Sequence, residues 1–210
     1  MSVRPAVFLD RDGVLNEFVI DPRSGAARSP YAAEQVRLIP GAAAGAAQLA
    51  HAGYELVCIT NQPAAAHGGV SVAQLLQVHR RVEQLLGAAG VTLAGSRVCW
   101  HHPEGVVPGL AVGCACRKPA PGMLLDAARA LSLDLRCSWM VGDSDTDVAA
   151  GHAAGCRTVL IEYDHTAHKR SSGERPELRA LDLADAVERL LACAGADALS
   201  EMRPDGLRSR

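Results

Sequence analysis

Aromatic residues are scarce in this 210-residue chain, in which phenylalanine, tryptophan and tyrosine together make up 3% of the residues. So few rings leave no platform on which bases could stack. Long basic runs are also missing, and the formal net charge at pH 7 is only -2. Nucleic acid is therefore not an expected partner. No apolar run approaches the roughly 18 residues that a membrane-spanning helix needs, so we expect no membrane partner either.

The N-terminal residues run straight into a strand-like segment and leave no room for the apolar core of a secretory leader. The chain has seven cysteines, an odd number, and three of them cluster beside a histidine. That usage is typical of metal binding in a reducing compartment and not of a disulfide framework. The sequence thus predicts a cytoplasmic protein, which we expect to be a monomer. An apolar content of 49% is enough for a sizeable globular core.

Apolar runs of strand length alternate with segments of helical periodicity. The strand-like runs are 7–10, 55–60, 97–100, 138–143 and 158–161, and the helical segments are 41–52, 71–89, 121–131, 144–154 and 181–194. This alternation predicts an α/β fold with a doubly wound parallel sheet. We expect one domain over residues 1–194, without a large cap domain. Residues 13–40 are too long and irregular for a simple turn and are expected to form a flap, and residues 195–210 a flexible tail.

The first apolar run ends in Asp10-Arg11-Asp12-Gly13, which would deliver two carboxylates to one loop at the carboxyl edge of the sheet. One carboxylate can attack an electrophile while the other moves protons. Taken alone, Asp-x-Asp-Gly is also compatible with a helix N-cap cluster that follows a buried strand. Further polar groups must therefore converge on the same place before a catalytic interpretation is justified.

Polar residues do follow the other predicted strands. Thr60 and Asn61 end the second strand, Asp143 ends the fourth, and Lys118 precedes a helix. The carboxyl ends of neighbouring parallel strands share one crevice, where ligands bind. Converging aspartates favour a hard divalent cation such as Mg²⁺. A cation together with a lysine and a hydroxyl forms a trap for an anion, and phosphate is the obvious candidate.

A second constellation lies in segment 99–118, which we expect to form a zinc loop. Its candidate ligands are Cys99, His101, Cys114 and Cys116. Three thiolates and one imidazole make a complete tetrahedral zinc set with no position left for water, as in a structural site. In zinc-finger peptides such a site contributes ~10–16 kcal/mol of apparent binding energy. The alternatives are His102 in place of His101, and buried cysteines beside an incidental histidine.

In this order the motifs resemble those of phosphatases of the haloacid dehalogenase (HAD) superfamily. The four motifs are Asp10-x-Asp12-Gly13, Thr60, Lys118 and the segment from Gly142-Asp143 to Asp147. The resemblance implies a Rossmann-like HAD fold and an aspartyl-phosphate intermediate. It implies Asp10 as the nucleophile and Asp12 as the general acid and base.

The same resemblance implies that Thr60 and Lys118 contact the phosphoryl group. Mg²⁺ would be held by Asp10, by the backbone carbonyl of Asp12 and by Asp143. Asp147, one helical turn after Asp143, would support these ligands without binding the metal itself.

The segment 99–123, with Cys-x-His, Cys-x-Cys-Arg-Lys-Pro and Pro-Gly-Met, resembles a zinc-loop subgroup of that superfamily. Its members act on heptose 1,7-bisphosphate or on histidinol phosphate, and the pattern here favours the heptose type. The likeness covers roughly residues 5–190. It implies His101 as the zinc ligand, and Arg117 and Asn61 as substrate contacts. The expected function is a Mg²⁺-dependent phosphomonoesterase of a small sugar phosphate; the alternatives are a histidinol phosphatase and an inactive, zinc-stabilised binding protein.

Three places depart from the heptose subgroup, and the smallest change is Val14, where threonine is frequent. After Asn61-Gln62 the subgroup usually continues with Ser-Gly and places an arginine three residues further on, whereas this chain has Pro63 and then alanines before His67. Ser144 stands where a lysine is frequent. These changes leave the predicted chemistry intact and bear on specificity.

Overall fold

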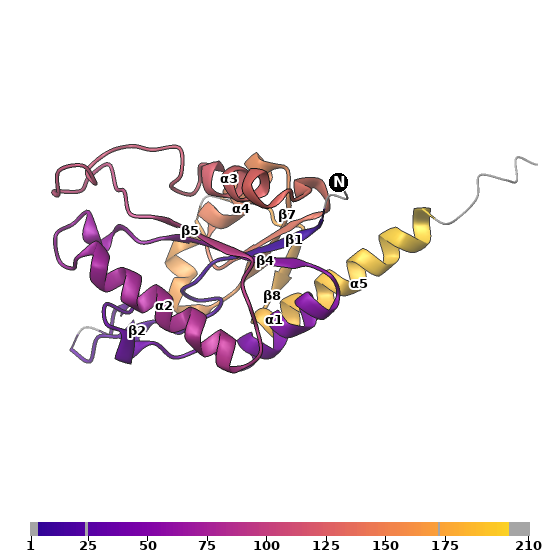
Figure 1. The fold of residues 1–210 in the computed structure, drawn as a ribbon, viewed down its shortest axis with the longest axis horizontal. Coiled ribbons are helices and arrows are strands. Elements are labelled where there is room, and N and C mark those ends of the chain that lie inside the picture. The colour runs from indigo at the N-terminus through magenta and orange to yellow at the C-terminus, as the bar shows by residue number, and fades with distance from the viewer. Residues whose placement is uncertain (1–3, 24, 172, 202–210) are drawn as a thin grey trace, which may run out of the picture.

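The structure is a computed structural model that describes residues 4–23, 25–171 and 173–201. A six-stranded sheet with the order β5-β4-β1-β6-β7-β8 forms its centre (Figure 1). The strands are β1 (Ala6–Leu9), β4 (Glu55–Asn61), β5 (Gly95–Cys99), β6 (Trp139–Gly142), β7 (Arg157–Ile161) and β8 (Leu178–Ala180). Each neighbouring pair is parallel. The predicted doubly wound parallel sheet is confirmed, with β8 as an added edge strand.

Helices cover both faces of the sheet (Figure 1). The helices α1 (Ala42–His51), α2 (Val72–Ala88) and α5 (Leu183–Glu201) pack on one face, and α3 (Gly122–Leu131) and α4 (Asp145–Ala154) on the other. The sequence predicts a flexible tail from residue 195, but α5 continues as far as Glu201. Residues 202–210 lie outside the described part of the chain. No helix in the described residues is long and apolar enough to cross a membrane.

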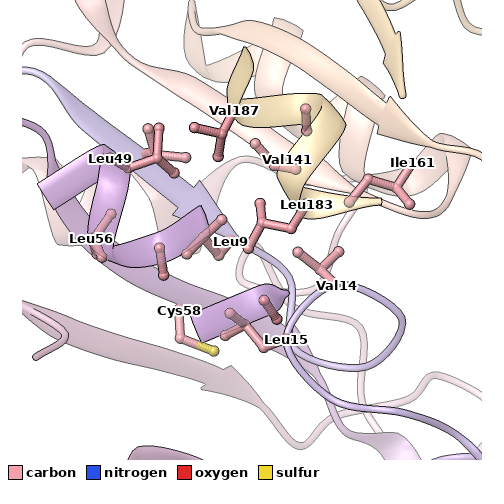
Figure 2. Close-up of a cluster of buried hydrophobic side chains, with 14 of the residues drawn as sticks. Leu9, Val14, Leu15, Leu49, Leu56, Cys58, Val141, Ile161, Leu183 and Val187 are labelled. Atoms are coloured by element: carbon pink, nitrogen blue, oxygen red, sulfur yellow. The ribbon is translucent and has the colours of Figure 1, made fainter. Parts of the chain in front are cut away.

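Strand β1 explains why the two faces have separate cores. Successive side chains of a strand point to opposite faces. Val7 and Leu9 therefore join a cluster with α1, α2 and α5, while Ala6 and Phe8 join a cluster with α3 and α4. Figure 2 shows the first cluster, in which Leu9 lies among side chains of α1 and α5. All four residues of β1 are 0% exposed, so the strand rigidly fixes the loop that follows it.

The segment 13–40 contains a short antiparallel hairpin of β2 (Val19–Ile20) and β3 (Ala27–Arg28). The remaining short elements are 3₁₀ helices: η1 (Ala33–Gln35), η2 (Pro63–Ala65), η3 (Leu135–Cys137) and η4 (Asp164–Lys169).

After β1, the chain first adds β4 and β5 on one side of that strand. It then crosses to the other side and adds β6, β7 and β8, so the direction of strand addition changes between β1 and β6. The backbone N–H of Asp10 donates to the carbonyl of Val141 across this boundary, at 2.9 Å. In open α/β sheets the crevice outside the carboxyl ends of the strands at such a switch point is the usual ligand site. The fold therefore predicts a ligand site at the carboxyl ends of β1 and β6.

Candidate active site

A cavity of about 390 Å³ opens at the carboxyl ends of β1, β4 and β6. Its lining includes the residues of all four predicted motifs, together with several that the sequence did not single out. The lining residues are Asp10, Asp12, Phe18, Ser29, Thr60, Asn61, Pro63, Arg117, Lys118, Asp143, Ser144, Thr146, Asp147 and Lys169. The predicted convergence of the motifs on one crevice is therefore seen in the structure.

Lys118 lies at the centre of the acidic groups. Its Nζ is 3.0 Å from Asp10 Oδ1 and 2.5 Å from Asp147 Oδ1, and it donates to the carbonyl of Ile59 at 2.8 Å. The lysine is 2% exposed. Burial alone would lower the pKa of Lys118, but the two carboxylates raise it above its ordinary value. The ammonium group therefore stays charged beside Asp10.

Three carboxylates remain crowded despite this lysine. One oxygen from each of Asp10, Asp143 and Asp147 lies within 4.8 Å of the others. Burial raises the pKa of Asp10 to about 6, although Lys118 acts in the opposite direction. Burial, followed by repulsion from Asp10 and Asp147, raises the pKa of Asp143 to about 8. The folded chain thus concentrates more negative charge than its own cation compensates.

The Oδ2 atom of Asp143 is buried and has no hydrogen-bond partner among the described residues. A buried carboxylate oxygen without a donor is costly unless a cation or a proton satisfies it. Hard divalent cations prefer carboxylate oxygens of this kind. The geometry of the site therefore fits a magnesium ion beside Asp10 and Asp143.

Asp147 is engaged differently. Its Oδ2 accepts from the backbone N–H of Ser144 at 3.2 Å and from the hydroxyl of Ser144 at 2.5 Å, while its Oδ1 faces Lys118. The residue thereby caps the start of α4 and holds Lys118 in place. Asp147 thus contacts Ser144 through one oxygen and Lys118 through the other, and whether it also binds the metal stays a prediction.

Two glycines allow the strand-end loops to come this close. A Cβ atom on Gly142 would lie 2.2 Å from the Cβ of Asp147. Gly13 has φ +88°, and a Cβ there would lie 2.3 Å from Asp143 Oδ2. Side chains at these positions would push the first and fourth motifs apart.

Asp12 is held by a network that includes residues the sequence analysis missed. Arg11 donates to both of its oxygens, from Nε and Nη2, at 3.0–3.1 Å. Asn16 donates at 2.9 Å and Gln62 at 2.7 Å. Burial would raise the pKa of Asp12, but Arg11, Gln62 and Asn16 hold it below its ordinary value. The residue is therefore ionised in this structure and held in a fixed orientation at the cavity.

A signal for Arg11 does exist in the sequence, since an arginine between two aspartates at the end of an apolar strand has natural partners on both sides. The guanidinium group is 0% exposed. Asn16 and Gln62 carry no comparable signal, because their positions relative to Asp12 depend on the path of two different loops.

Thr60 is the penultimate residue of β4 and lines the cavity, and its hydroxyl accepts from Gln62 Nε2 at 2.9 Å. Asn61 also lines the cavity, but both of its amide atoms contact the backbone of Lys118. Asn61 Nδ2 donates to the Lys118 carbonyl at 3.0 Å, and the Lys118 N–H donates to Asn61 Oδ1 at 3.1 Å. In this arrangement Asn61 positions Lys118, a role that differs from the substrate contact expected from the resemblance.

Arg117 lines the cavity next to Lys118, and its Nη1 lies 3.4 Å from the carbonyl of His101. This contact joins the cavity to the zinc loop. Loops contribute further residues that the sequence did not identify. Phe18 and Ser29 come from the flap and Lys169 from η4, and none of them carries a motif that could have marked it.

The four candidate zinc ligands form a second cluster. The Sγ atoms of Cys99, Cys114 and Cys116 are 3.1–3.6 Å apart, and His101 Nδ1 lies 3.4 Å from Cys116 Sγ. A zinc ion with bonds of about 2.3 Å to sulfur needs ligand atoms roughly 3.8 Å apart, so a small expansion accommodates it. The neighbouring His102 is not in the cluster; its Nδ1 accepts from the N–H of Glu104 at 3.2 Å.

Comparison with known proteins gives this arrangement a family. The sequence profile of the HAD-hydrolase-like family matches residues 115–186. A D-glycero-beta-D-manno-heptose-1,7-bisphosphate 7-phosphatase of Rhodopseudomonas palustris is 40% identical over 154 residues, covering 72% of this chain and 80% of that protein. A D-glycero-alpha-D-manno-heptose-1,7-bisphosphate 7-phosphatase of Photorhabdus laumondii is 35% identical over 159 residues, covering 75% and 82%.

Among solved structures, a D,D-heptose 1,7-bisphosphate phosphatase of B. bronchiseptica, complexed with magnesium and phosphate, matches with a TM-score of 0.73 at 32% identity. The match covers 90% of this chain and 98% of that one. The chain therefore belongs to the HAD-like hydrolases. Within that family it is a phosphatase, a phosphoric monoester hydrolase.

Proposed function

We propose that this phosphatase removes the 7-phosphate of D-glycero-D-manno-heptose 1,7-bisphosphate. The observation that carries the chemistry is the contact between Asp10 and Lys118, 3.0 Å apart at the cavity. The carboxylate can attack phosphorus, and the ammonium group beside it can compensate the negative charge of the phosphoryl oxygens. The heptose substrate is supported by relatives of 40% and 35% identity that carry this activity in their names.

Asp10, Asp143 and the backbone carbonyl of Asp12 are the groups we assign to Mg²⁺. The partnerless Asp143 Oδ2 and the crowding of carboxylates support this assignment. A magnesium ion there supplies positive charge to the phosphoryl oxygens and lets an anionic substrate approach an anionic nucleophile.

In the first step, an oxygen of Asp10 attacks phosphorus, and the bond from phosphorus to the sugar oxygen breaks. Asp12 takes up a proton when the phosphate ester enters the site and gives it to the departing sugar oxygen. The Thr60 hydroxyl and the Lys118 ammonium bind the phosphoryl oxygens while phosphorus passes from the sugar oxygen to the Asp10 oxygen. The product on the enzyme is an aspartyl phosphate, the acyl phosphate of Asp10.

In the second step, Asp12 removes a proton from a water molecule, whose oxygen attacks the same phosphorus atom. The bond between phosphorus and Asp10 breaks, inorganic phosphate leaves, and Asp12 is protonated again. Arg11, Gln62 and Asn16 stabilise the carboxylate form that accepts this proton. These contacts fix the position of the Asp12 carboxylate at the cavity, where it can reach the water molecule.

We assign a structural zinc ion to Cys99, His101, Cys114 and Cys116. The spacing of their ligand atoms supports this, as does the complete set of four donors. Three of the seven cysteines serve as candidate metal ligands, a usage that supports a reducing compartment, and we place the enzyme in the cytoplasm as a monomer.

The test is release of inorganic phosphate from heptose 1,7-bisphosphate and from histidinol phosphate, with Mg²⁺ and with EDTA. We expect rapid release of one equivalent from the heptose substrate, loss of activity in EDTA and recovery when Mg²⁺ is restored. Faster hydrolysis of histidinol phosphate would reassign the substrate. No release from either ester with Mg²⁺ present would favour the inactive binding protein.

A further inference from the structure

The basic residues of this chain are almost all arginines. Of 21 basic residues, 19 are arginine and only two are lysine, at positions 118 and 169. Both lysines line the same cavity. Lysine offers a compact ammonium group on a flexible stem, whereas arginine offers a broad planar fork. Together with Arg117, the two lysines gather three positive charges in one cavity.

The two lysines are bound very differently. Lys118 is buried and contacts three acceptors, two of them carboxylates. Lys169 is exposed, and no carboxylate in the described part of the chain forms an ion pair with it. Its Nζ lies 4.8 Å from the centroid of the Phe18 ring, a cation–π contact that orients the ammonium without consuming its hydrogen-bond donors. Lys169 can therefore bind an anion without first breaking a salt bridge.

The element that carries Lys169 is anchored at the catalytic edge of the sheet. The hydroxyl of Thr166, a buried residue of η4, lies 3.2 Å from the backbone carbonyl of Asp143. Arg170 donates to the carbonyl of Tyr163 at 2.9 Å and closes the same turn. Phe18 from the flap stacks on Tyr163 with ring centroids 6.0 Å apart. The flap and η4 thus form one wall of the cavity, with Lys169 upon it.

We propose that Lys169 binds the phosphate that is not transferred and so makes the enzyme select doubly phosphorylated sugars over monophosphates. This inference rests on the proposed function, since it needs a substrate with two phosphates. Asp10, Thr60 and Lys118 are taken up by the phosphate that reacts. In the described part of the chain, two cations of the cavity lining have no ion pair with a carboxylate: Arg117, whose Nη1 lies 3.4 Å from the carbonyl of His101, and Lys169, which has only the ring contact with Phe18.

The test compares kcat and KM for heptose 1,7-bisphosphate and for the heptose 7-phosphate in Lys169→Met, Lys169→Arg and the matched control Arg80→Met, which removes an exposed cation outside the cavity. Lys169→Met should reduce kcat/KM for the bisphosphate about ten- to a hundredfold, mainly through KM, as loss of a charge-assisted hydrogen bond does. The monophosphate should change less than about threefold. Lys169→Arg should retain most of the selectivity, and Arg80→Met all of it.

Equal losses on both substrates, or no loss on the bisphosphate, would overturn the inference. Failure of the proposed function is a separate outcome, recognised when the unmodified enzyme hydrolyses neither heptose ester. The same variants are then compared on fructose 1,6-bisphosphate and fructose 6-phosphate, and an unmodified enzyme without preference for the bisphosphate also overturns the inference.

A second readout does not depend on turnover. Because Lys118 is buried, Lys169 is the accessible lysine for trinitrobenzenesulfonate, and mass spectrometry distinguishes it from the N-terminal amine. In Asp10→Asn protein, the bisphosphate should protect Lys169 from modification, and the monophosphate should protect it much less. Unchanged modification in the presence of saturating bisphosphate counts against the assignment.

Discussion

The two clusters of potential metal ligands in this enzyme are built in opposite ways. The cysteine and histidine ligands all lie between residues 99 and 116, so one loop can gather them. The carboxylates come from residues 10, 143 and 147, and they meet only when β1 and β6 are paired in the sheet. The first cluster can help to form its surroundings, whereas the second depends on a fold that already exists.

The clusters also differ in how completely they are satisfied. Three sulfurs and a nitrogen give the zinc loop a full tetrahedral set. Among the carboxylates, Lys118 compensates part of the charge, but Asp143 keeps a buried oxygen without a partner. A closed site holds structure, and an open one leaves coordination positions for a substrate. The following experiments test this division of roles, beginning with the largest effect.

Replacement of Asp10 by asparagine should stop catalysis without disturbing the zinc loop. The amide cannot form the phosphorylated intermediate, so we expect phosphate release to fall by at least about a thousandfold. Zinc content should stay the same. The measurement is single-turnover phosphate release beside metal analysis. The matched control is Asp126→Asn, at an exposed position of α3 outside the cavity. Activity close to that of the unmodified enzyme would refute the nucleophile assignment.

Replacement of Cys114 by serine should affect zinc binding and stability and leave the magnesium site intact. We expect loss of zinc and a decrease in the free energy of unfolding on the order of 3 kcal/mol or more, because the loop loses the metal that orders it. The magnesium ligands come from other elements and should retain Mg²⁺ binding. Thermal or urea unfolding and zinc analysis provide the measurement.

The matched control for that experiment is Cys137→Ser, since Cys137 is exposed and lies outside the cluster. It should change neither zinc content nor stability. If Cys114→Ser behaved like this control, the zinc loop would have no structural ion.

Magnesium affinity should weaken as the pH falls from about 8 to about 6. The pKa of Asp143 is raised to about 8 and that of Asp10 to about 6, so below these values protons occupy oxygens that the cation needs. Each proton displaced weakens apparent binding about tenfold per pH unit. Calorimetric titration with Mg²⁺ at several pH values measures the slope. Asp143→Asn should bind Mg²⁺ weakly at every pH, and an affinity that did not vary with pH would contradict the proposed ligands.

The smallest effect concerns the link between the two regions. Asn61 holds the backbone of Lys118, the residue at the end of the zinc loop, with two hydrogen bonds. Asn61→Ala should lower kcat by about five- to tenfold with little change in KM, because Lys118 loses both hydrogen bonds that position its backbone. Asn61→Asp, which keeps the acceptor for the Lys118 N–H, should lose less. A rise in KM at constant kcat would instead make Asn61 a substrate contact.

The sequence predicted most of the regular structure, because buried strands and amphipathic helices leave local patterns. The predicted runs at 7–10 and 55–60 lie within one residue of β1 and β4. The edge strand β8 was missed, since Leu178–Ala180 is too short to carry a periodic signal. The helical continuation of α5 to Glu201 was missed because Gly195 weakens the helical pattern there.

The chain by itself determined the chemical groups: an Asp-x-Asp pair after a buried strand, and cysteine and histidine spacings that fit one metal. Such signals are local, and short stretches of backbone fix them. Only the tertiary structure decided that Lys118 lies between Asp10 and Asp147. The same holds for the hydrogen bond from Asn61 to the backbone of Lys118 and for the position of Lys169 in the cavity lining. Those contacts join segments distant along the chain, and their geometry is set by strand order and packing, which no single segment encodes.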